Sequence, residues 1–369
     1  MKNLAIIGAS YLQLPLIEKA KAMGYTTHVF AWAANDVGEK AADYFYPISI
    51  IEKEEILNIC RKIDICGICS IASDLSVITV NYVAENMGLN GNTMHSTMMS
   101  TNKHLMREAF KRNGDPSPKS YIFKGKEDLK ELDLKYPIIV KPTDRSGSRG
   151  IFKVNSIDEA MQAIVHAKEE SFEKNVLIEE FIEGKEYSVE YISYNGEHYF
   201  LAITEKYTTG APNFIETGHL EPAPLDDKIT DKIKLVVTHA LDSLEIKNGA
   251  SHSEVKIDDE GKIFIIEIGA RMGGDCIGSD LVKYSTGYDF VKMVIQVACG
   301  EKPDFTQICI PKKVYCKFIF NENDIKELHL LKEKHPELLI KIINYQPEYI
   351  GKITDSSNRA GCYIKRIVE

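Results

Sequence analysis

The first 90 residues alternate between short apolar runs and longer stretches in which apolar residues recur at helical spacing. Short apolar runs predict buried strands, and the helical stretches predict amphipathic helices. Strand–helix alternation at this spacing is typical of a parallel sheet with helices on both faces. We therefore expect an N-terminal α/β unit, with Asp74 as the N-cap of its third helix. The expected strands are at 4–7, 27–31 and 63–71, and the expected helices are at 12–23, 52–62 and 74–87.

Beyond residue 100 the pattern changes to a mixture of helices and longer strands. A helix is expected at 101–114, and it ends before the proline-containing stretch 115–118. Proline stops helices and disfavours them one residue earlier, so this stretch predicts a boundary. From 121 to 180, strands and helices alternate around a loop of small residues.

Two hairpins are expected in the second half of the chain. Strands within 185–206 meet at Asn195-Gly196, which is typical of a type I′ turn, and strands within 250–270 meet around 258–261. The other expected features are a polar, proline-containing segment at 207–227, helices at 230–244 and 287–299, and a small α+β tail at 311–369.

Length, composition and charge narrow the class of protein. The chain has 369 residues, enough for two or three packed lobes, and its hydrophobic content of 44% is ordinary for a globular protein. A net charge of -9 argues against electrostatic binding of nucleic acid. Because no apolar run reaches about 18 residues and the first one is too short for a signal peptide, we expect a cytoplasmic protein that does not bind membranes.

Eight cysteines are scattered along the chain. Cys66 and Cys69 have the spacing of a metal-binding or redox pair, but they lie inside an apolar run. No second pair or histidine cluster completes four ligands. Because cysteine is among the most buried residue types, we interpret them as buried thiols and predict neither a disulfide framework nor a zinc site.

The first candidate site is an apolar strand that ends in a lysine and leads into a loop of small residues. Small residues let backbone N–H groups approach phosphate oxygens, and a lysine adds a point charge beside them. The sequence lacks the GK[ST] of a Walker A loop, and an ordinary surface turn is the alternative. The candidate phosphate-binding residues are Lys141, Ser146, Gly147, Ser148 and Gly150.

The second candidate site is a strand that ends in an acidic pair, crosses a glycine and then resumes. Extended backbone at such a crossing offers N–H and C=O groups to an adenine edge. A carboxylate two residues past the glycine is placed to accept hydrogen bonds from ribose hydroxyls. The alternative is a hairpin with a solvated acidic face. The candidates are Glu179, Glu180, Phe181, Ile182 and Glu186.

The third candidate site is a pair of glutamates on the second hairpin. Glu267 lies among isoleucines, where an unpaired carboxylate is costly. If the hairpin turns without a bulge, the numbers of any two facing residues add up to the same odd number. Glu254 and Glu267 then become neighbours. Two converging carboxylates need a cation, and Mg²⁺ shared with nucleotide phosphates fits. Arg271, just past the strand, suits a carboxylate or phosphoryl group, with a buried Glu–Arg pair as the alternative.

In this order and at these separations, the three groups of residues resemble the ATP-grasp superfamily, over nearly the whole chain. The fold class that the resemblance implies is α/β and α+β. It consists of a Rossmann-like pre-ATP-grasp domain at 1–100, an ATP-grasp domain at 101–305 with a small lobe at about 118–182, and a C-terminal α+β subdomain at 306–369.

The resemblance also implies roles for individual residues. Lys103 and Lys141 would contact the nucleotide phosphates, and the loop from Ser146 to Gly150 would close over them. Arg271 would stabilise an acyl-phosphate and its transition state. The implied adenine and ribose contacts are Glu179, Glu180, Phe181, Ile182 and Glu186, and the implied ligands of Mg²⁺, or of Mn²⁺ in its place, are Glu254 and Glu267.

One position departs from the pattern of the superfamily. The usual Glu-x-Asn-x-Arg is replaced here by a sequence with Gly269 in place of the asparagine, so a second metal ion is left to the two glutamates or a water. Within the superfamily, the stretches 269–275 and 217–219 look most like carboxylate–amine ligases such as the L-amino acid (dipeptide) ligases. His219 is a candidate catalytic residue that binds phosphate or substrate, and His252 is a second histidine of this kind; a structural role is the alternative for both.

By this resemblance we expect an enzyme that uses ATP to join a small-molecule carboxylate to an amine. The loop of small residues and the segment 207–227 are expected to act as a lid, and a homodimer is expected. A ligase that uses bicarbonate or formate, as in carbamoyl-phosphate or purine synthesis, is one alternative. A binding protein without turnover is another. A dinucleotide-dependent oxidoreductase rests only on Gly8-Ala9-Ser10, which lacks the full GxGxxG.

Overall fold

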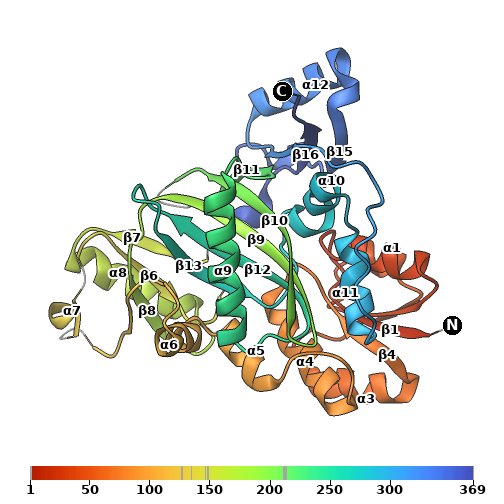
Figure 1. The fold of residues 1–369 in the computed structure, drawn as a ribbon, viewed down its shortest axis with the longest axis horizontal. Helices are drawn as coiled ribbons and strands as arrows, with labels where there is room; N and C mark the ends of the chain where they lie inside the picture. Colours follow the sequence, from red (N-terminus) through yellow and green to blue (C-terminus); the bar gives the residue numbers. More distant parts are fainter. Residues whose placement is uncertain are drawn as a thin grey trace.

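The chain folds around three sheets, which lie in a row. Figure 1 shows the N-terminal sheet in red and orange at one end, a small sheet in yellow at the other, and a large sheet in green and teal between them. Among the described residues, no helix combines the length and the apolar character that crossing a membrane requires. The computed structural model describes residues 2–125, 128–133, 135–145, 147, 149–210 and 214–368.

The N-terminal sheet has the order β3-β2-β1-β4 with parallel pairing throughout, which confirms the expected α/β unit. Asp74 is not the N-cap of α4; Ser73 is, because its backbone is extended and its hydroxyl accepts a hydrogen bond from the N–H of Ser76. The strands are β1 (Asn3–Ile7), β2 (Thr26–Phe30), β3 (Tyr44–Tyr46) and β4 (Ile65–Cys69). The helices up to the small sheet are α1 (Leu14–Ala22), α2 (Val37–Ala41), α3 (Lys53–Ile63), α4 (Asp74–Met87), α5 (Met94–Thr101) and α6 (Lys103–Asn113).

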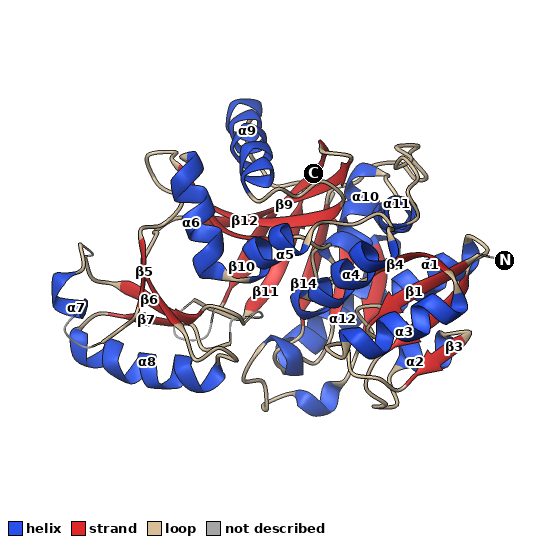
Figure 2. Cartoon of the chain, turned by 90° about the horizontal axis from the view of Figure 1, so that it is seen from below, coloured by secondary structure: helices blue, strands red, loops and turns tan. Residues whose placement is uncertain are grey.

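The small sheet is antiparallel, in the order β5-β8-β6-β7, and one long helix covers it. Val140 and Val176 of the sheet pack against Ile164 of that helix, and all three are buried. Figure 2 shows this layer at the end of the molecule opposite the N-terminal sheet. The elements are β5 (Ser120–Ile122), α7 (Asp128–Glu131), β6 (Ile138–Pro142), β7 (Phe152–Val154), α8 (Ile157–Glu170) and β8 (Val176–Glu180).

The large sheet has eight strands in the order β13-β12-β9-β10-β11-β14-β16-β15. The hairpin turn at Asn195-Gly196 has φ values of 53° and 83°, as a type I′ turn requires. Strand β11 pairs with β14, so the residues expected as a separate C-terminal piece continue the same sheet. The strands are β9 (Lys185–Tyr194), β10 (Glu197–Thr208), β11 (Glu216–Glu221), β12 (Gly249–Ile257), β13 (Ile263–Gly269), β14 (Val314–Phe318), β15 (Leu339–Ile343) and β16 (Cys362–Arg366).

Helices cover the large sheet and join it to the N-terminal unit, where α11 packs against α1 and β4. Helix α9 lies across the green and teal strands in Figure 1. These helices are α9 (Asp227–Ser243), a π-helical turn (Ile277–Leu281) that runs into α10 (Val282–Thr286), α11 (Phe290–Ala298) and α12 (Glu322–Lys334); short 3-10 turns are at Pro336–Leu338, Pro347–Tyr349 and Ser356–Asn358.

The segment expected as a polar lid at 207–227 is different in the structure. Strand β10 extends to Thr208, and β11 lies in the middle of the large sheet, paired on both sides. Buried positions at Gly218, His219 and Glu221 explain why a segment of polar composition forms a strand: its polar groups are enclosed rather than solvated.

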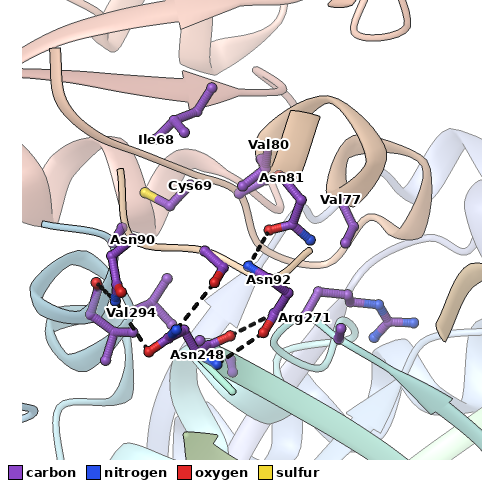
Figure 3. Close-up of a pocket in the computed structure, with 17 residues that line it drawn as sticks. Ile68, Cys69, Val77, Val80, Asn81, Asn90, Asn92, Asn248, Arg271 and Val294 are labelled. Atoms are coloured by element: carbon purple, nitrogen blue, oxygen red, sulfur yellow. Dashed lines mark hydrogen bonds between the residues drawn. The ribbon is translucent and has the colours of Figure 1, made fainter. Parts of the chain in front are cut away.

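Asparagine side chains tie the N-terminal unit to the large sheet (Figure 3). The Asn92 side chain donates to the carbonyl of Asn248 at 2.7 Å and accepts from the backbone N–H groups of Lys247 and Asn248. Asn81 accepts from the N–H of Asn92 at 3.1 Å. Arg271 lines the hollow beside these bonds. The joint therefore fixes the position of α4 relative to the hairpin of β12 and β13. Arg271 comes just after this hairpin.

Candidate active site

Two glutamates face each other across the hairpin of β12 and β13. Glu254 pairs directly with Glu267, as expected, but the reason given for the pairing was wrong. Near the turn, Ile257 pairs with Ile263, so the two residue numbers add up to an even number. A register shift next to Glu254 leaves Ile266 as an extra, bulged residue. Beyond this bulge, the numbers of paired residues add up to an odd number. The bulge, rather than its absence, places the two carboxylates opposite each other.

Lysines neutralise both glutamates. Lys206 Nζ lies 2.7 Å from Glu254 Oε1 and 2.8 Å from Glu186 Oε1. Lys103 Nζ lies 2.8 Å from Glu267 Oε1. Burial alone would raise the pKa of Glu254, but the charge of Lys206 outweighs it and holds that pKa well below its ordinary value. Glu254 is therefore ionised at neutral pH.

These two carboxylates are suitable ligands for a hard divalent cation. Each lysine contact involves Oε1 of its glutamate, and both side chains keep about a quarter of their surface exposed, at 27% and 25%. Ionised carboxylate oxygens on two adjacent strands are the donors that Mg²⁺ takes from proteins, alongside water and nucleotide phosphates. Mn²⁺ accepts the same oxygen donors.

A buried triad holds Lys141. Glu179 receives Arg107 Nε at 2.7 Å on one oxygen and Lys141 Nζ at 2.6 Å on the other. Burial lowers the pKa of Lys141, whereas for Glu179 the two cations outweigh burial and lower the pKa of the carboxyl. The Glu179 side chain thus positions the lysine. Arg107 was not identified from the sequence, and it also donates to the carbonyl of Ile266 at 2.5 Å, which anchors the bulge.

The candidate adenine and ribose contacts gather in one hollow between the small and large sheets. Ile139, Ile151 and Ile266 give this hollow apolar walls. The carbonyl of Ile182 accepts a hydrogen bond from Lys256 at 3.2 Å. Apolar walls beside a polar strand crossing suit a flat heteroaromatic base. The predicted residues that line the hollow are Lys141, Glu179, Glu180, Phe181, Ile182, Glu186, Glu254 and Glu267.

The described residues of the loop of small residues follow β6. Gly147 and Gly150 have left-handed φ values of 68° and 71°. Lys103 donates to the carbonyl of Arg145 at 2.6 Å, which ties the start of the loop to α6. The candidates Ser146 and Ser148 lie outside the described residues.

Arg271 is held by the N-terminal unit. Its Nε and Nη2 atoms contact the two oxygens of Asp74 at 2.7 and 2.9 Å. Burial would raise the pKa of Asp74, but Arg271 lowers it. A Cβ at Gly269 would lie 2.8 Å from Asp74 Oδ1 and 3.2 Å from Arg271 Nε. A side chain at position 269 would therefore require the Asp74–Arg271 ion pair to shift, whereas glycine leaves room for it.

A second, larger hollow of about 540 Å³ adjoins the first. The N-terminal unit contributes Tyr11 and Asp74, and β11 contributes Glu216 and His219. Lys206, Glu216 and Glu254 line both hollows, so the two meet at Glu254. Charged residues dominate the wall: Asp74, Arg149, Lys206, Glu216, Glu254, Arg271, Asp275, Asp355 and Arg359.

The two histidines differ in charge. His219 is fully buried, neither of its ring nitrogens has a hydrogen-bond partner among the described residues, and burial lowers its pKa. Asp275 Oδ2 lies 3.9 Å from Nε2, too far for a hydrogen bond. Burial would also lower the pKa of His252, but its contact with Glu190 outweighs this and raises the pKa to about 9. His252, not His219, therefore carries positive charge beside Glu254, 3.7 Å away.

Sequence reasoning missed several residues of the site. Lys206 had a signal, because it is a lysine at the end of the apolar run of β10. Glu190 and Arg359 gave none, because each looks like an ordinary charged residue until the fold encloses it. Glu190 accepts the N–H of Gly273 at 3.1 Å, and Arg359 Nη2 lies 2.5 Å from Asp275.

Comparison with known proteins gives one domain match and many relatives. Residues 134–280 match the ATP-grasp domain family. The alanine–anticapsin ligase of Bacillus subtilis (strain 168) is 26% identical over 316 residues, which cover 76% of this chain and 66% of that protein. The chain spans less than two thirds of the length of the three alanine–anticapsin ligases to which it is similar.

Solved structures share the whole architecture. The L-amino acid ligase of Bacillus licheniformis has a TM-score of 0.81 and 23% identity, covering 99% of this chain and 93% of that one. The phosphoribosylglycinamide synthetase of Anaerococcus prevotii has a TM-score of 0.79 and 23% identity, covering 99% and 94%. The chain therefore has the ATP-grasp fold, and residues 134–280 belong to the ATP-grasp domain family.

Proposed function

We propose that the protein is an ATP-dependent carboxylate–amine ligase, which forms an amide bond through an acyl-phosphate and releases ADP and phosphate. The observation that carries the proposal is the position of Glu254 and Glu267. Glu254 lies where the hollow with apolar walls meets the larger charged hollow, and Glu267, its partner across the hairpin, lines the first hollow. A nucleotide in the first hollow would place its terminal phosphate at the entrance to the second.

The residues of the site have separate tasks in this reaction. Lys103 and Lys141 supply positive charge to the phosphates of ATP. Glu254 and Glu267 would hold Mg²⁺, which neutralises phosphate charge when bound.

The chemistry needs no protein nucleophile. An oxygen of the substrate carboxylate bonds to the terminal phosphorus of ATP, and ADP leaves. The amine nitrogen then bonds to the acyl carbon, phosphate leaves and the amine loses a proton. The N–H groups of Arg271 that do not contact Asp74 would bind the oxygens on which negative charge develops, and Asp74 fixes the orientation of the guanidinium. Positioning and charge neutralisation do most of the work in such transfers.

The names of the relatives support an amino acid as one substrate. Two of them are called alanine–anticapsin ligase and L-amino acid ligase. The charged wall suits a zwitterion, since Arg149 and Arg271 offer positive charge and Glu216 and Asp275 offer negative charge. Bicarbonate or formate would leave most of a hollow of about 540 Å³ unfilled. A homodimer in the cytoplasm remains part of the proposal by family likeness.

Hydroxamate formation tests the proposal. Purified protein is mixed with Mg-ATP, hydroxylamine and pools of amino acids and other carboxylates, so that hydroxylamine replaces the unknown amine. We expect a hydroxamate from a limited set of acids, lost in Glu267→Gln and kept in Glu260→Gln, an exposed glutamate in the turn of the same hairpin. ATP binding without a hydroxamate from any acid would instead favour bicarbonate as the substrate or a binding protein without turnover.

A further inference from the structure

Three cysteines that are far apart in the sequence converge beneath the wall of the larger hollow. The Sγ atoms of Cys276, Cys316 and Cys362 all lie within 4.8 Å of one another, and those of Cys276 and Cys362 are 3.6 Å apart. All three side chains are buried, and all three are free thiols. Five other cysteines in the chain do not join them.

The fold explains this convergence. Cys316 of β14 pairs with Ile364 of β16, and Phe318 pairs with Cys362, so the two cysteines are diagonal neighbours on one face of the sheet. Cys276 comes from the chain that follows β13, where it has a left-handed φ of 65°. That conformation is uncommon for a residue with a side chain, and it turns the chain back onto the sheet.

We propose that these three thiols bind a single thiophilic metal ion with a filled d shell, Cu(I) or Zn(II). Sulfur ligands about 2.3 Å from an ion lie about 3.8–4.0 Å from one another in tetrahedral or trigonal geometry. The observed separations, 3.6 Å for one pair and at most 4.8 Å for the set, bracket this value. Thiolates select soft ions, and three of them complete the shell of Cu(I).

A cation lies near the thiols, Arg359, but its charge is paired with that of Asp275 at 2.5 Å. The neighbouring Cys276 thiol and burial raise the pKa of Cys316 well above its ordinary value. A metal ion reverses this preference, because its charge stabilises the thiolates it binds. Ordinary core packing of three small side chains is the alternative, and it requires no convergence of the sulfur atoms.

A small hollow lies beside two of the thiols. This hollow of about 10 Å³ borders Cys276 and Cys362 and has room for about one water molecule. It shares Tyr11, Asp275 and Arg359 with the larger hollow. The two hollows therefore share a wall, and a water in the small hollow would complete four ligands for Zn(II).

An occupied site would brace the substrate wall. Cys276 directly follows Asp275, which lines the larger hollow and pairs with Arg359. A metal ion would bind this turn to two strands of the large sheet. The inference does not depend on the proposed ligase activity.

The test uses the full-length protein, reduced and free of oxygen. Cu(I), supplied as its acetonitrile complex, competes for the protein against a copper chelator, and Zn(II) competes against a zinc chelator in a parallel titration. The variants are Cys316→Ala and, as a matched control, Cys60→Ala, which also removes one fully buried thiol. We expect one equivalent of one ion in the natural protein and in the control, and affinity roughly 100-fold lower or worse in Cys316→Ala.

X-ray absorption of the loaded natural protein decides the ligand set without any variant. Three sulfur neighbours at about 2.3 Å support the proposal, with no lighter neighbour around Cu(I) or with one added oxygen around Zn(II). Fewer than three sulfur neighbours overturns it. So does a natural protein that binds neither ion, or a control that loses as much affinity as Cys316→Ala.

Discussion

The Asp74–Arg271 pair shows how one residue sets the chemistry of another. The carboxylate comes from the N-terminal unit and the guanidinium from the end of the second hairpin. Two parallel hydrogen bonds fix the plane of the fork, which a single contact would not do. Asp74 therefore acts through Arg271, as a positioning residue.

Asp74→Asn should lower kcat without weakening ATP binding. Arg271 would lose one charged partner and its fixed orientation, and we expect a fall in kcat of about 10²-fold, as when one charge-stabilising donor is lost. Arg271→Lys should behave similarly. Steady-state kinetics of hydroxamate formation provide the measurement, with Asp64→Asn, an exposed aspartate of the same unit, as the control. Equal kcat in Asp74→Asn and in the control would contradict the positioning role.

Glu221 makes stability depend on pH. Burial raises its pKa to about 7, although hydroxyl groups of Ser285 and Thr204 donate to it and lower that pKa. Because the folded state holds the proton more tightly than the unfolded chain, where the pKa is near 4.5, stability falls as the pH rises from about 4.5 through 7. The loss reaches up to about 3 kcal/mol.

Glu221→Gln should remove this contribution. Urea unfolding of the natural protein and of the variant at several pH values between 5 and 8 measures it, and the difference between their free energies isolates Glu221 from other titrating groups. A difference that does not change with pH would show that Glu221 is ionised throughout.

At the scale of elements, Arg107 joins three of them. It lies on α6, pairs with Glu179 of β8 and donates to the bulge of β13. Arg107→Ala leaves a buried carboxylate with one partner fewer, and we expect a loss of about 3–5 kcal/mol in the free energy of unfolding. Chemical denaturation measures it. Arg112→Ala, at an exposed position on the same helix, should change stability by no more than about 0.5 kcal/mol.

The sequence predicted elements well where local chemistry decides them. Asn195-Gly196 requires left-handed backbone at both positions, and the turn follows. Strand β11 was not predicted, because Gly218, His219 and Glu221 give no apolar alternation and become buried only through pairing with β10 and β14. The sequence correctly predicted that Glu254 and Glu267 face each other, but it did so by assuming a hairpin without a bulge. A bulge at Ile266 produces this pairing, and no local signal in the sequence marks that bulge.

At the scale of the whole molecule, the site depends on contacts between units. The asparagine joint holds the N-terminal unit, and with it Asp74, against the large sheet. Neither this joint nor the cysteine cluster was visible in the sequence, because each brings together residues from distant segments. Composition and spacing carry no information about such contacts. The ATP-grasp resemblance supplied the order of the units instead.

Asn92→Ala should loosen the joint. The variant loses its bond to the carbonyl of Asn248 and leaves the N–H groups of Lys247 and Asn248 without their side-chain acceptor. We expect a loss of roughly 2–4 kcal/mol in stability and a lower kcat, because Asp74 moves with the N-terminal unit. Denaturation and hydroxamate kinetics measure the two effects. Asn86→Ala, on the exposed face of α4, should change neither stability nor kcat. A lowered stability with an unchanged kcat in Asn92→Ala would show that the joint does not influence the site.

The central claim is the transfer of phosphate onto a carboxylate, and oxygen tracing tests it most directly. The carboxylate that gives a hydroxamate is labelled with oxygen-18 and turned over with ATP and its amine, and the released phosphate is examined by mass spectrometry. Formation of an acyl-phosphate predicts that one carboxylate oxygen leaves with each phosphate. Unlabelled phosphate, released while amide accumulates, would contradict the account.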